Sequence, residues 1–519
     1  MKLASTKLTI LPVILGVIFA QAQTAPPPSA FPSAINHVIV VFQENRTPDN
    51  LFQGLFGLTG ANGIPYNIQN FYTDPSGVQH ALRPVGMAAN FDLDHSDATN
   101  PNSGFQFENT HPGVPVSPSC GPDIFGCATS PTDPVSPTNQ FMFVDNSISY
   151  HYNNAYGQGT THVLDPYLAF AKQYGWANHM FQTNQGPSYP AHQFIFGGTS
   201  GDTDSSATFV SENFGRGTAA GCLAPSNATN FTVSPVSNGS CPAGCTCFDN
   251  GLAAECPTPQ GFSFCYNHAT MATMLDFPPP PKQKISWKYY APSAGSIWTA
   301  PNSIAAICSP SGGQCMGQEW QTNVDLNPTD ILKDINNCQL PQVSWAIPDG
   351  RWSDHANVDH GLGSSWVAAI INAIGGFQNN CGYWNNTAIV VTWDDWGGWF
   401  DHETPFQLTL NPPCQTPATN CQGDYQYGFR VPLMVVSAYT PSGYVNDIKP
   451  HDFGSILRMI QGIFGLQEGG LGFADARATT DLRAFFSLTQ PRAYTVVPAI
   501  KDATFFLSLA GPPVAPDND

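Results

Sequence analysis

The chain has 519 residues, of which 42% are hydrophobic and only 11% are charged, with a formal net charge of −19. This acidic balance repels the phosphate backbone, so nucleic acid is excluded as an expected partner. A small phosphate ester is not excluded, because a bound cation can reverse the local field. Gly and Pro number 47 each, which predicts long loops around a globular core.

The N-terminus is predicted to be a signal peptide over residues 1–22. Lys2 and Lys7 precede the apolar run 8–20, and Ala20-Gln21-Ala22 has the form of a cleavage site. The apolar run is short for a membrane span, and no later stretch approaches about 20 apolar residues, so we expect no transmembrane segment in the mature chain. An uncleaved anchor is the alternative. Fourteen cysteines, an even number, predict disulfides and a secreted or periplasmic protein.

The segments after the Pro-rich leader (23–34) predict an α/β fold. Unbroken apolar runs at 38–42 and 388–393 are typical of strands buried on both faces, as in a parallel sheet. Further strands are predicted at 177–182, 285–292, 342–348 and 427–441, and helices at 167–174, 366–374 and 453–466. Together they predict a three-layer sandwich with a central, mostly parallel sheet. The catalytic domain is predicted at 35–200 and 285–490, interrupted by a Cys-rich insertion or cap at 201–284 and followed by a tail at 491–519.

Polar residues follow two of the predicted strands directly. Glu44 and Asn45 follow the first, and Asp394 and Asp395 follow the later one. Ligands bind beyond the carboxyl ends of strands in such sheets, and adjacent carboxylates repel each other unless a cation or proton compensates them. We therefore predict a metal site. The alternatives are a Glu44–Arg46 ion pair and a solvated turn.

Other candidate residues lie near the same predicted edge. Ser188 follows a Gly-Pro turn at the start of a predicted helix, where the helix dipole favours an alkoxide and an incoming phosphate. A simple N-cap serine is the alternative. His355 and His360 follow the strand at 342–348, and His95 lies among aspartates, which suits a base or a ligand.

Five motifs, in order along residues 35–466, resemble one known family. They are INHVIVVFQENRTPDNLF, NQGPSYPAHQF, SDHANVDHGLG, TWDDWGGWFDHETP and YGFRVPLMVVSAY. The resemblance is to the bacterial phosphoesterase family of non-haemolytic phospholipases C and secreted acid phosphatases, which is related in fold to alkaline phosphatases. It implies a metal held by Glu44, Asn45, Asp394 and Asp395, with Ser188 as the nucleophile.

The resemblance also implies that His95 and His355 contact the phosphate or protonate the leaving group. We further predict Arg46, His360 and His402 as substrate-binding residues. Oxygen donors suit Ca²⁺, Mg²⁺ or Mn²⁺, and a histidine admits Zn²⁺, so the identity of the metal stays open. Acid phosphatases of the family have a histidine pair where this chain has Tyr289 and Tyr290.

The predicted function is a secreted, metal-dependent phosphoesterase of the phospholipase C type. The alternative is an acid phosphatase, and a lesser one is a non-catalytic secreted binding protein of the same fold. Phospholipid at a membrane surface would be the substrate of the first. Trp352, Trp396 and Trp399 are candidates for an apolar mouth, or equally for core residues. A sulfatase motif, GxSxG and HExxH are all absent from the sequence.

Overall fold

The computed structural model describes the chain outside its uncertain segments. The described residues are 28–74, 76–88, 92–96, 141–146, 161–215, 217–235, 242–248, 253–259, 262–356, 358, 360–376, 381–408 and 425–515. The predicted signal peptide lies outside these residues. None of the helices in the described part of the chain has the length and apolar character needed to span a bilayer.

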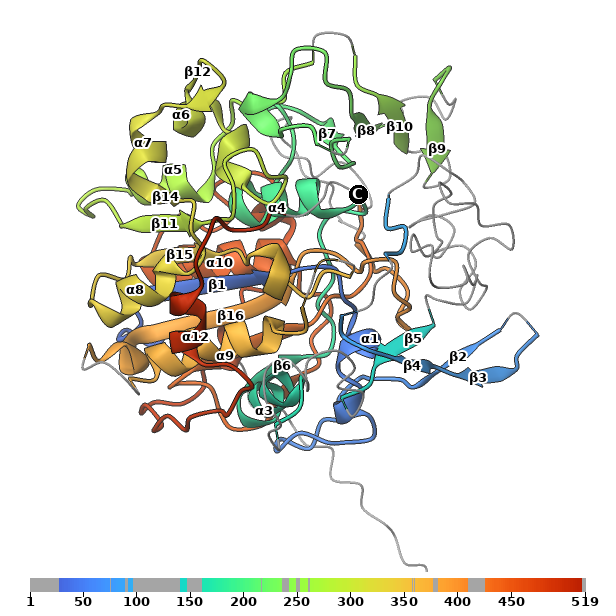
Figure 1. Ribbon diagram of the computed structural model, residues 1–519, viewed down its shortest axis with the longest axis vertical. Helices are drawn as coiled ribbons and strands as arrows, with labels where there is room; N and C mark the ends of the chain where they lie inside the picture. The colour runs from blue at the N-terminus through green and yellow to red at the C-terminus, as the bar shows by residue number, and fades with distance from the viewer. Residues whose placement is uncertain are drawn as a thin grey trace, which may run out of the picture.

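An eight-stranded sheet forms the centre of the molecule (Figure 1). Its strands, in spatial order, are β14 (Val324–Asp325), β11 (Trp287–Tyr290), β15 (Val343–Ala346), β1 (His37–Gln43), β16 (Thr387–Trp393), β19 (Leu433–Ser437), β6 (Gly175–Ala177) and β20 (Tyr444–Asn446). Only β19 runs antiparallel to its neighbours in this sheet. The predicted mixed α/β fold with a mostly parallel sheet is therefore confirmed.

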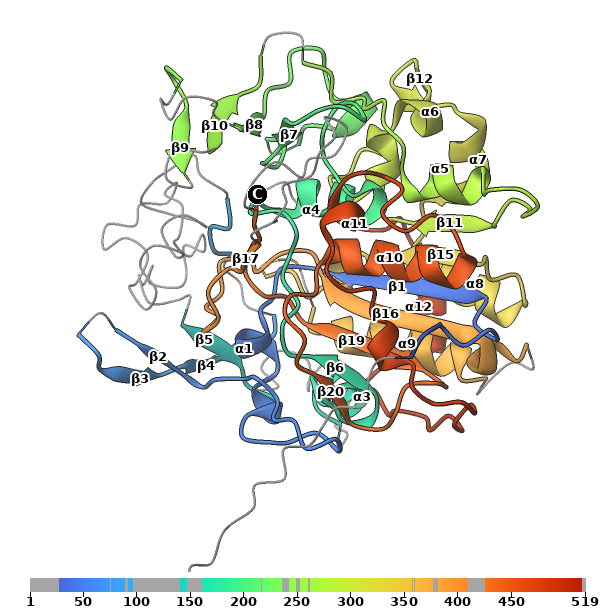
Figure 2. The ribbon, with the colours of Figure 1, turned by 180° about the vertical axis from the view of Figure 1, so that it is seen from behind.

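Helices cover both faces of the sheet and make the three layers (Figures 1 and 2). One layer contains α4 (Ser188–Gly197) and α10 (Phe453–Phe464), which pack on each other. The other contains α3 (Asp165–Gln173), α8 (Asp330–Asn336), α9 (Gly363–Ile374) and α12 (Ala503–Ser508). The helix predictions at 167–174, 366–374 and 453–466 agree with α3, α9 and α10. The strand predicted at 177–182 is misplaced, because β6 already begins at Gly175.

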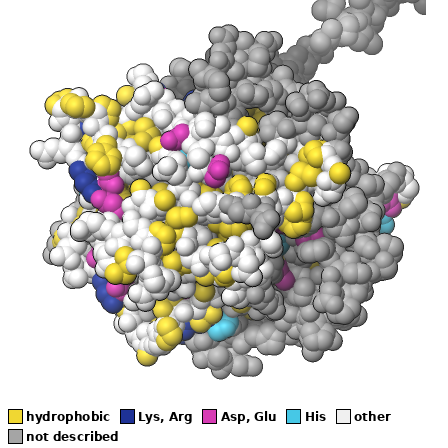
Figure 3. All heavy atoms as spheres, turned by 90° about the horizontal axis from the view of Figure 1, so that it is seen from above, with side chains coloured by type: hydrophobic (Ala, Val, Ile, Leu, Met, Phe, Trp, Pro, Cys, Tyr) yellow, Lys and Arg dark blue, Asp and Glu magenta, His cyan; other side chains and the backbone are white. Residues whose placement is uncertain are grey.

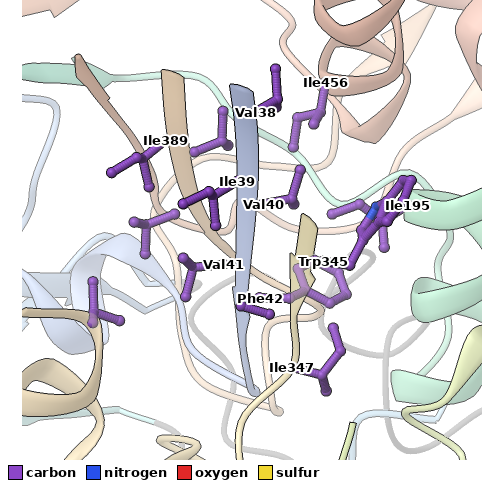
Figure 4. Close-up of a cluster of buried hydrophobic side chains, with 14 of the residues drawn as sticks. Val38, Ile39, Val40, Val41, Phe42, Ile195, Trp345, Ile347, Ile389 and Ile456 are labelled. Carbon is purple, nitrogen blue, oxygen red and sulfur yellow. The ribbon is translucent and has the colours of Figure 1, made fainter. Parts of the chain in front are cut away.

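The core is built around β1, whose side chains are buried on both faces. Val38 and Val40 point to the side where Ile456 of α10 lies, whereas Ile39 and Val41 point to the other side (Figure 4). All four are fully buried. This double burial explains the unbroken apolar run in the sequence.

The face seen in Figure 3 shows few charged side chains among hydrophobic and uncharged polar ones.

The segment between α4 and β11 contains a second, four-stranded antiparallel sheet. It consists of β7 (Phe209–Val210), β8 (Phe231–Pro235), β10 (Ala253–Pro257) and β9 (Thr246–Phe248). Disulfide Cys245–Cys256 links the start of β9 to β10, and Cys222–Cys265 joins two other parts of the same segment. Disulfides Cys308–Cys315 and Cys338–Cys381 lie elsewhere. Figure 1 shows this sheet on the side of the molecule towards which β1 ends. The disulfides fit the oxidising compartment predicted from the cysteine count.

A buried charge cluster joins the start of β19 to the loop after β16. Because β19 is antiparallel to β16, Arg430 lies at the carboxyl end of β16. Its guanidinium donates to both oxygens of Asp401, at 2.7 and 2.9 Å, and lies 3.6 Å from Asp49. His402 Nδ1 in turn lies 2.6 Å from the second oxygen of Asp49. The cluster therefore fixes the loop that follows Asp394 and Asp395.

Replacing Arg430 with methionine should lower the free energy of unfolding by about 3–5 kcal/mol, because two buried carboxylates lose their cation. Chemical denaturation measures the loss. The double variant Arg430→Met/Asp401→Asn should be more stable than the single variant, since one uncompensated charge is removed. A loss below about 0.5 kcal/mol in the single variant would contradict a structural role for the pair.

Candidate active site

The site lies where β1 and β16 end side by side. The two strands are in parallel register up to Gln43 and Trp393, so Glu44 and Asn45 leave the sheet beside Asp394 and Asp395. The backbone N–H of Asn45 donates to Asp394 Oδ1 at 2.8 Å. All four side chains are fully buried. The structure thus brings together the four residues that the sequence predicts as metal ligands.

The backbone around these residues is tightly constrained. Asn45 has a φ of 57°, in the left-handed region that asparagine tolerates better than most residues. Gly397 has a φ of 63°, and a Cβ at this position would stand 2.4 Å from the Asn45 carbonyl oxygen. The turn after Asp395 therefore needs glycine for both its conformation and its close approach. Strain of this kind is concentrated at functional sites.

Ser188 is the first residue of α4 and points into the same group. Its hydroxyl lies 3.2 Å from Asp395 Oδ2 and 3.5 Å from Asn45 Oδ1. Pro187 occupies the N-cap position, and no side chain caps this helix. The alternative of a simple N-cap serine is therefore wrong, and the Ser188 hydroxyl faces the acidic residues.

His192 is the residue of this group that sequence reasoning missed. It lies four residues after Ser188, one helical turn along α4, and its Nε2 is 3.1 Å from Glu44 Oε1. Atoms of Glu44, His192 and Asp394 lie within 4.8 Å of one another. A lone histidine in an apolar helix resembles a core residue. The available signal was its spacing from Ser188, which places both side chains on one face of the helix.

The electrostatics of this group favour a bound cation. Burial raises the pKa of Glu44 well above its usual range, and the charges of Asp394 and Asp395 raise it further. Burial, and then the charge of Asp394, raises the pKa of Asp395 in the same direction. Burial lowers the pKa of His192 to about 3, so this imidazole is neutral and does not offset the carboxylates.

Two buried carboxylate oxygens indicate that a cation would offset the charges of this group. Glu44 Oε2 and Asp394 Oδ2 have no hydrogen-bond partner in the described part of the chain. A buried carboxylate oxygen without a partner is costly, whereas such oxygens are the ligands that divalent cations prefer. The donor set of Glu44, Asn45, Asp394 and Asp395 therefore fits a divalent metal ion.

His95 bonds to Asn45, and the ring of His355 lies near that of His95. His95 Nδ1 bonds to the Leu93 carbonyl at 2.7 Å, which leaves Nε2 to accept from the Asn45 amide at 2.9 Å. His355 Nδ1 bonds to the Ala356 carbonyl at 2.5 Å, and the two rings are 6.4 Å apart. His95 therefore contacts the group that contains Ser188, and His355 lies next to His95.

The contacts observed for the three residues predicted to bind substrate lie outside the group of Glu44, Asn45, Asp394 and Asp395. Arg46 donates to the carbonyls of Asp354 and Met87 and stacks on Trp399. His402 belongs to the Arg430 cluster, where the guanidinium already supplies positive charge beside the carboxylates. His360 is exposed on a loop.

The tryptophans predicted as candidates for an apolar mouth are buried. Trp396 and Trp399 are fully buried, and Trp352 is 2% exposed. Trp352 packs against Trp366 of α9. These tryptophans are therefore core residues that support the loops of the site, and they do not line an apolar mouth.

Comparisons with known proteins show which proteins the chain is similar to. The phosphoesterase family model matches residues 35–467. Phospholipase C B of Mycobacterium tuberculosis is 30% identical over 179 residues, covering 32% of this chain and 33% of that protein. Non-hemolytic phospholipase C of Burkholderia pseudomallei is 32% identical over 158 residues, covering 28% and 22%. The chain spans about a third or less of the length of these relatives.

Two further comparisons extend the range of similar proteins. Non-specific phospholipase C6 of Arabidopsis thaliana is 30% identical over 148 residues, covering 27% of this chain and 28% of that protein. The solved structure of a protein in the alkaline phosphatase superfamily, from Vibrio parahaemolyticus, superposes with a TM-score of 0.29 at 9% identity, covering 62% of this chain and 65% of that one. The family model, in contrast, extends over β1, α4, β15 and β16, which position the residues of the site. The chain therefore belongs to the phosphoesterase family.

Proposed function

We propose that this chain is a secreted, metal-dependent phosphoesterase of the phospholipase C type, with Ser188 as its nucleophile. The observation that carries the proposal is the position of the Ser188 hydroxyl, 3.2 Å from Asp395 and buried beside Glu44 and Asp394. The sequence supports secretion through the predicted signal peptide and the disulfides. The relatives named phospholipase C support a phosphodiester as the substrate.

The proposed reaction is a two-step displacement at phosphorus. In the first step the Ser188 hydroxyl gives its proton to Asp395, a bond forms between Ser188 Oγ and phosphorus, and the bond from phosphorus to the leaving oxygen breaks. In the second step water attacks phosphorus, the bond from phosphorus to Ser188 Oγ breaks, and the proton that the water loses returns to the Ser188 oxygen. A divalent cation held by Glu44, Asn45, Asp394 and Asp395 would supply positive charge to the phosphoryl oxygens and lower the pKa of the Ser188 hydroxyl.

The other residues of the site orient and move protons in this proposal. Asp395 accepts a hydrogen bond from Ser188 Oγ and so orients the hydroxyl. The start of α4 places Ser188 at the positive end of the helix dipole, which favours negative charge on its oxygen. His95 and His355 are the proposed contacts of the phosphate, and one of them protonates the departing alkoxide.

An acid phosphatase remains the second candidate. It is supported by the family resemblance, because the family that the motifs resemble includes secreted acid phosphatases as well as phospholipases C. Against it stand Tyr289 and Tyr290 in place of a histidine pair. Tyr289 donates to the Trp298 carbonyl, and Tyr290 donates to Asp334 at 2.6 Å, so neither hydroxyl is a free proton source for a leaving group. A non-catalytic relative is the third candidate, but the proposed nucleophile and metal ligands are all present.

Replacing Ser188 with alanine should lower kcat by roughly 10³-fold or more, because the nucleophile is lost, while metal binding weakens but persists. Steady-state kinetics and metal titration measure the two effects. Ser200→Ala is the matched control: this buried serine lies just beyond the other end of α4 and bonds to the Val210 carbonyl. It should retain activity. A fully active Ser188→Ala variant would remove Ser188 from the reaction.

Hydrolysis of p-nitrophenylphosphorylcholine and p-nitrophenyl phosphate, each with and without EDTA, tests the substrate class. We expect faster hydrolysis of the choline diester and loss of turnover with EDTA, restored by added divalent cations. Preference for the monoester would favour the acid phosphatase instead. If neither ester is hydrolysed with any added divalent metal, the proposed function is wrong.

A further inference from the structure

Among the described residues, His192 is the one histidine that touches the proposed metal ligands and to which neither the sequence motifs nor the family resemblance assigns a role. It is fully buried on α4, with its Nε2 atom 3.1 Å from Glu44 Oε1 and its ring packed on Phe42 and Trp298. Two readings are open for a histidine in this position. It either donates a hydrogen bond to Glu44, or it shares a cation with it.

The surroundings of Tyr289 fix which ring nitrogen of His192 carries the proton. The Tyr289 hydroxyl donates its single proton to the Trp298 carbonyl at 2.9 Å. Towards His192 Nδ1, at 3.4 Å, the hydroxyl can therefore only accept. A hydrogen bond between these two groups therefore requires the proton on Nδ1, and a neutral imidazole has only one.

Nε2 therefore presents its lone pair to Glu44. A lone pair facing a carboxylate oxygen at 3.1 Å is repulsive unless a proton on Glu44 or a metal cation lies between or beside the two atoms. Two ligand atoms that are each about 2.1 Å from one metal, at an angle of about 90°, are roughly 3 Å apart. The distance of 3.1 Å between Nε2 and Glu44 Oε1 therefore matches the distance expected between two neighbouring ligands of one ion.

Two independent features support a metal ion bound beside His192. Glu44 Oε2 and Asp394 Oδ2 are buried oxygens without a hydrogen-bond partner in the described part of the chain, and both belong to the residues that His192 adjoins. A metal-bound histidine also characteristically donates its second ring N–H to an oxygen acceptor that fixes its orientation. Tyr289 provides that acceptor here.

We propose that His192 is a nitrogen ligand of the metal centre, that Tyr289 is its positioning residue, and that the centre therefore selects a transition-metal dication over Mg²⁺ and Ca²⁺. The inference rests on the metal centre of the proposed function and defines its chemistry. Imidazole nitrogen suits ions such as Zn²⁺ and Fe²⁺, whereas Mg²⁺ and Ca²⁺ take oxygen ligands. An oxygen-only set of Glu44, Asn45, Asp394 and Asp395 would lack this preference.

Pulsed electron paramagnetic resonance of the Mn²⁺-loaded protein tests the nitrogen ligand directly. The wild-type protein should show echo modulation from a directly bound imidazole nitrogen, and His192→Gln should lose it. Mn²⁺ that binds without nitrogen modulation, or with modulation that survives in His192→Gln, would overturn the assignment while leaving the metal-dependent function intact. A wild-type protein that binds no divalent cation would overturn both.

Metal competition tests the selectivity and the role of Tyr289. His192→Gln should weaken Mn²⁺ and Zn²⁺ binding about 10–100-fold but change Mg²⁺ binding less than about threefold. Tyr289→Phe should weaken Mn²⁺ binding by about tenfold and keep the nitrogen modulation. Tyr290→Phe is the matched control and should leave metal affinity unchanged, since its hydroxyl bonds to Asp334. An equal loss for Mn²⁺ and Mg²⁺ in His192→Gln would indicate a hydrogen bond to Glu44 instead.

Discussion

The burial of several carboxylates without an equal number of cationic groups is the constraint on which this site depends. Glu44, Asp394 and Asp395 are all fully buried at the ends of two adjacent strands, beside a histidine whose pKa is lowered by burial. A folded protein tolerates such a group only if protons or a cation offset the charge. In the Arg430 cluster a guanidinium offsets the charge of the buried carboxylates. At the strand ends the chain supplies no equivalent group in its described part, and a metal ion is the fitting substitute.

The sheet and its loops hold this costly arrangement in place. Parallel register between β1 and β16 brings the two acidic pairs together, and the antiparallel β19 returns Arg430 to the same edge. Gly397 allows the loop after Asp395 to approach the strained Asn45 backbone. Helix α4 then adds Ser188 and His192 from one of its faces. The groups that would react and the groups that would bind metal therefore come from elements fixed by the core.

The sequence predicted the parts of this arrangement that depend on local pattern. Apolar runs ending in polar residues identified β1 and β16, and hence Glu44, Asn45, Asp394 and Asp395. The sequence did not identify His192, because its neighbours on α4 are apolar and its role depends on a contact with β1. It also did not predict the contacts of His402 with Asp49 and of Arg46 with Asp354 and Met87, since these partners come from other segments of the chain. The direction of β19 was not predictable either, because a buried run looks alike in both directions.

The central claim is that Ser188 attacks phosphorus beside the acidic group, and trapping the intermediate tests it most directly. The protein with its divalent metal is mixed with p-nitrophenylphosphorylcholine, quenched in acid within the first turnover, and digested for mass spectrometry. The account predicts that the peptide containing Ser188 gains the mass of the phosphorylcholine group, localised on Ser188 and absent in Ser188→Ala. Turnover with no modified Ser188, or with the group on another residue, would contradict it.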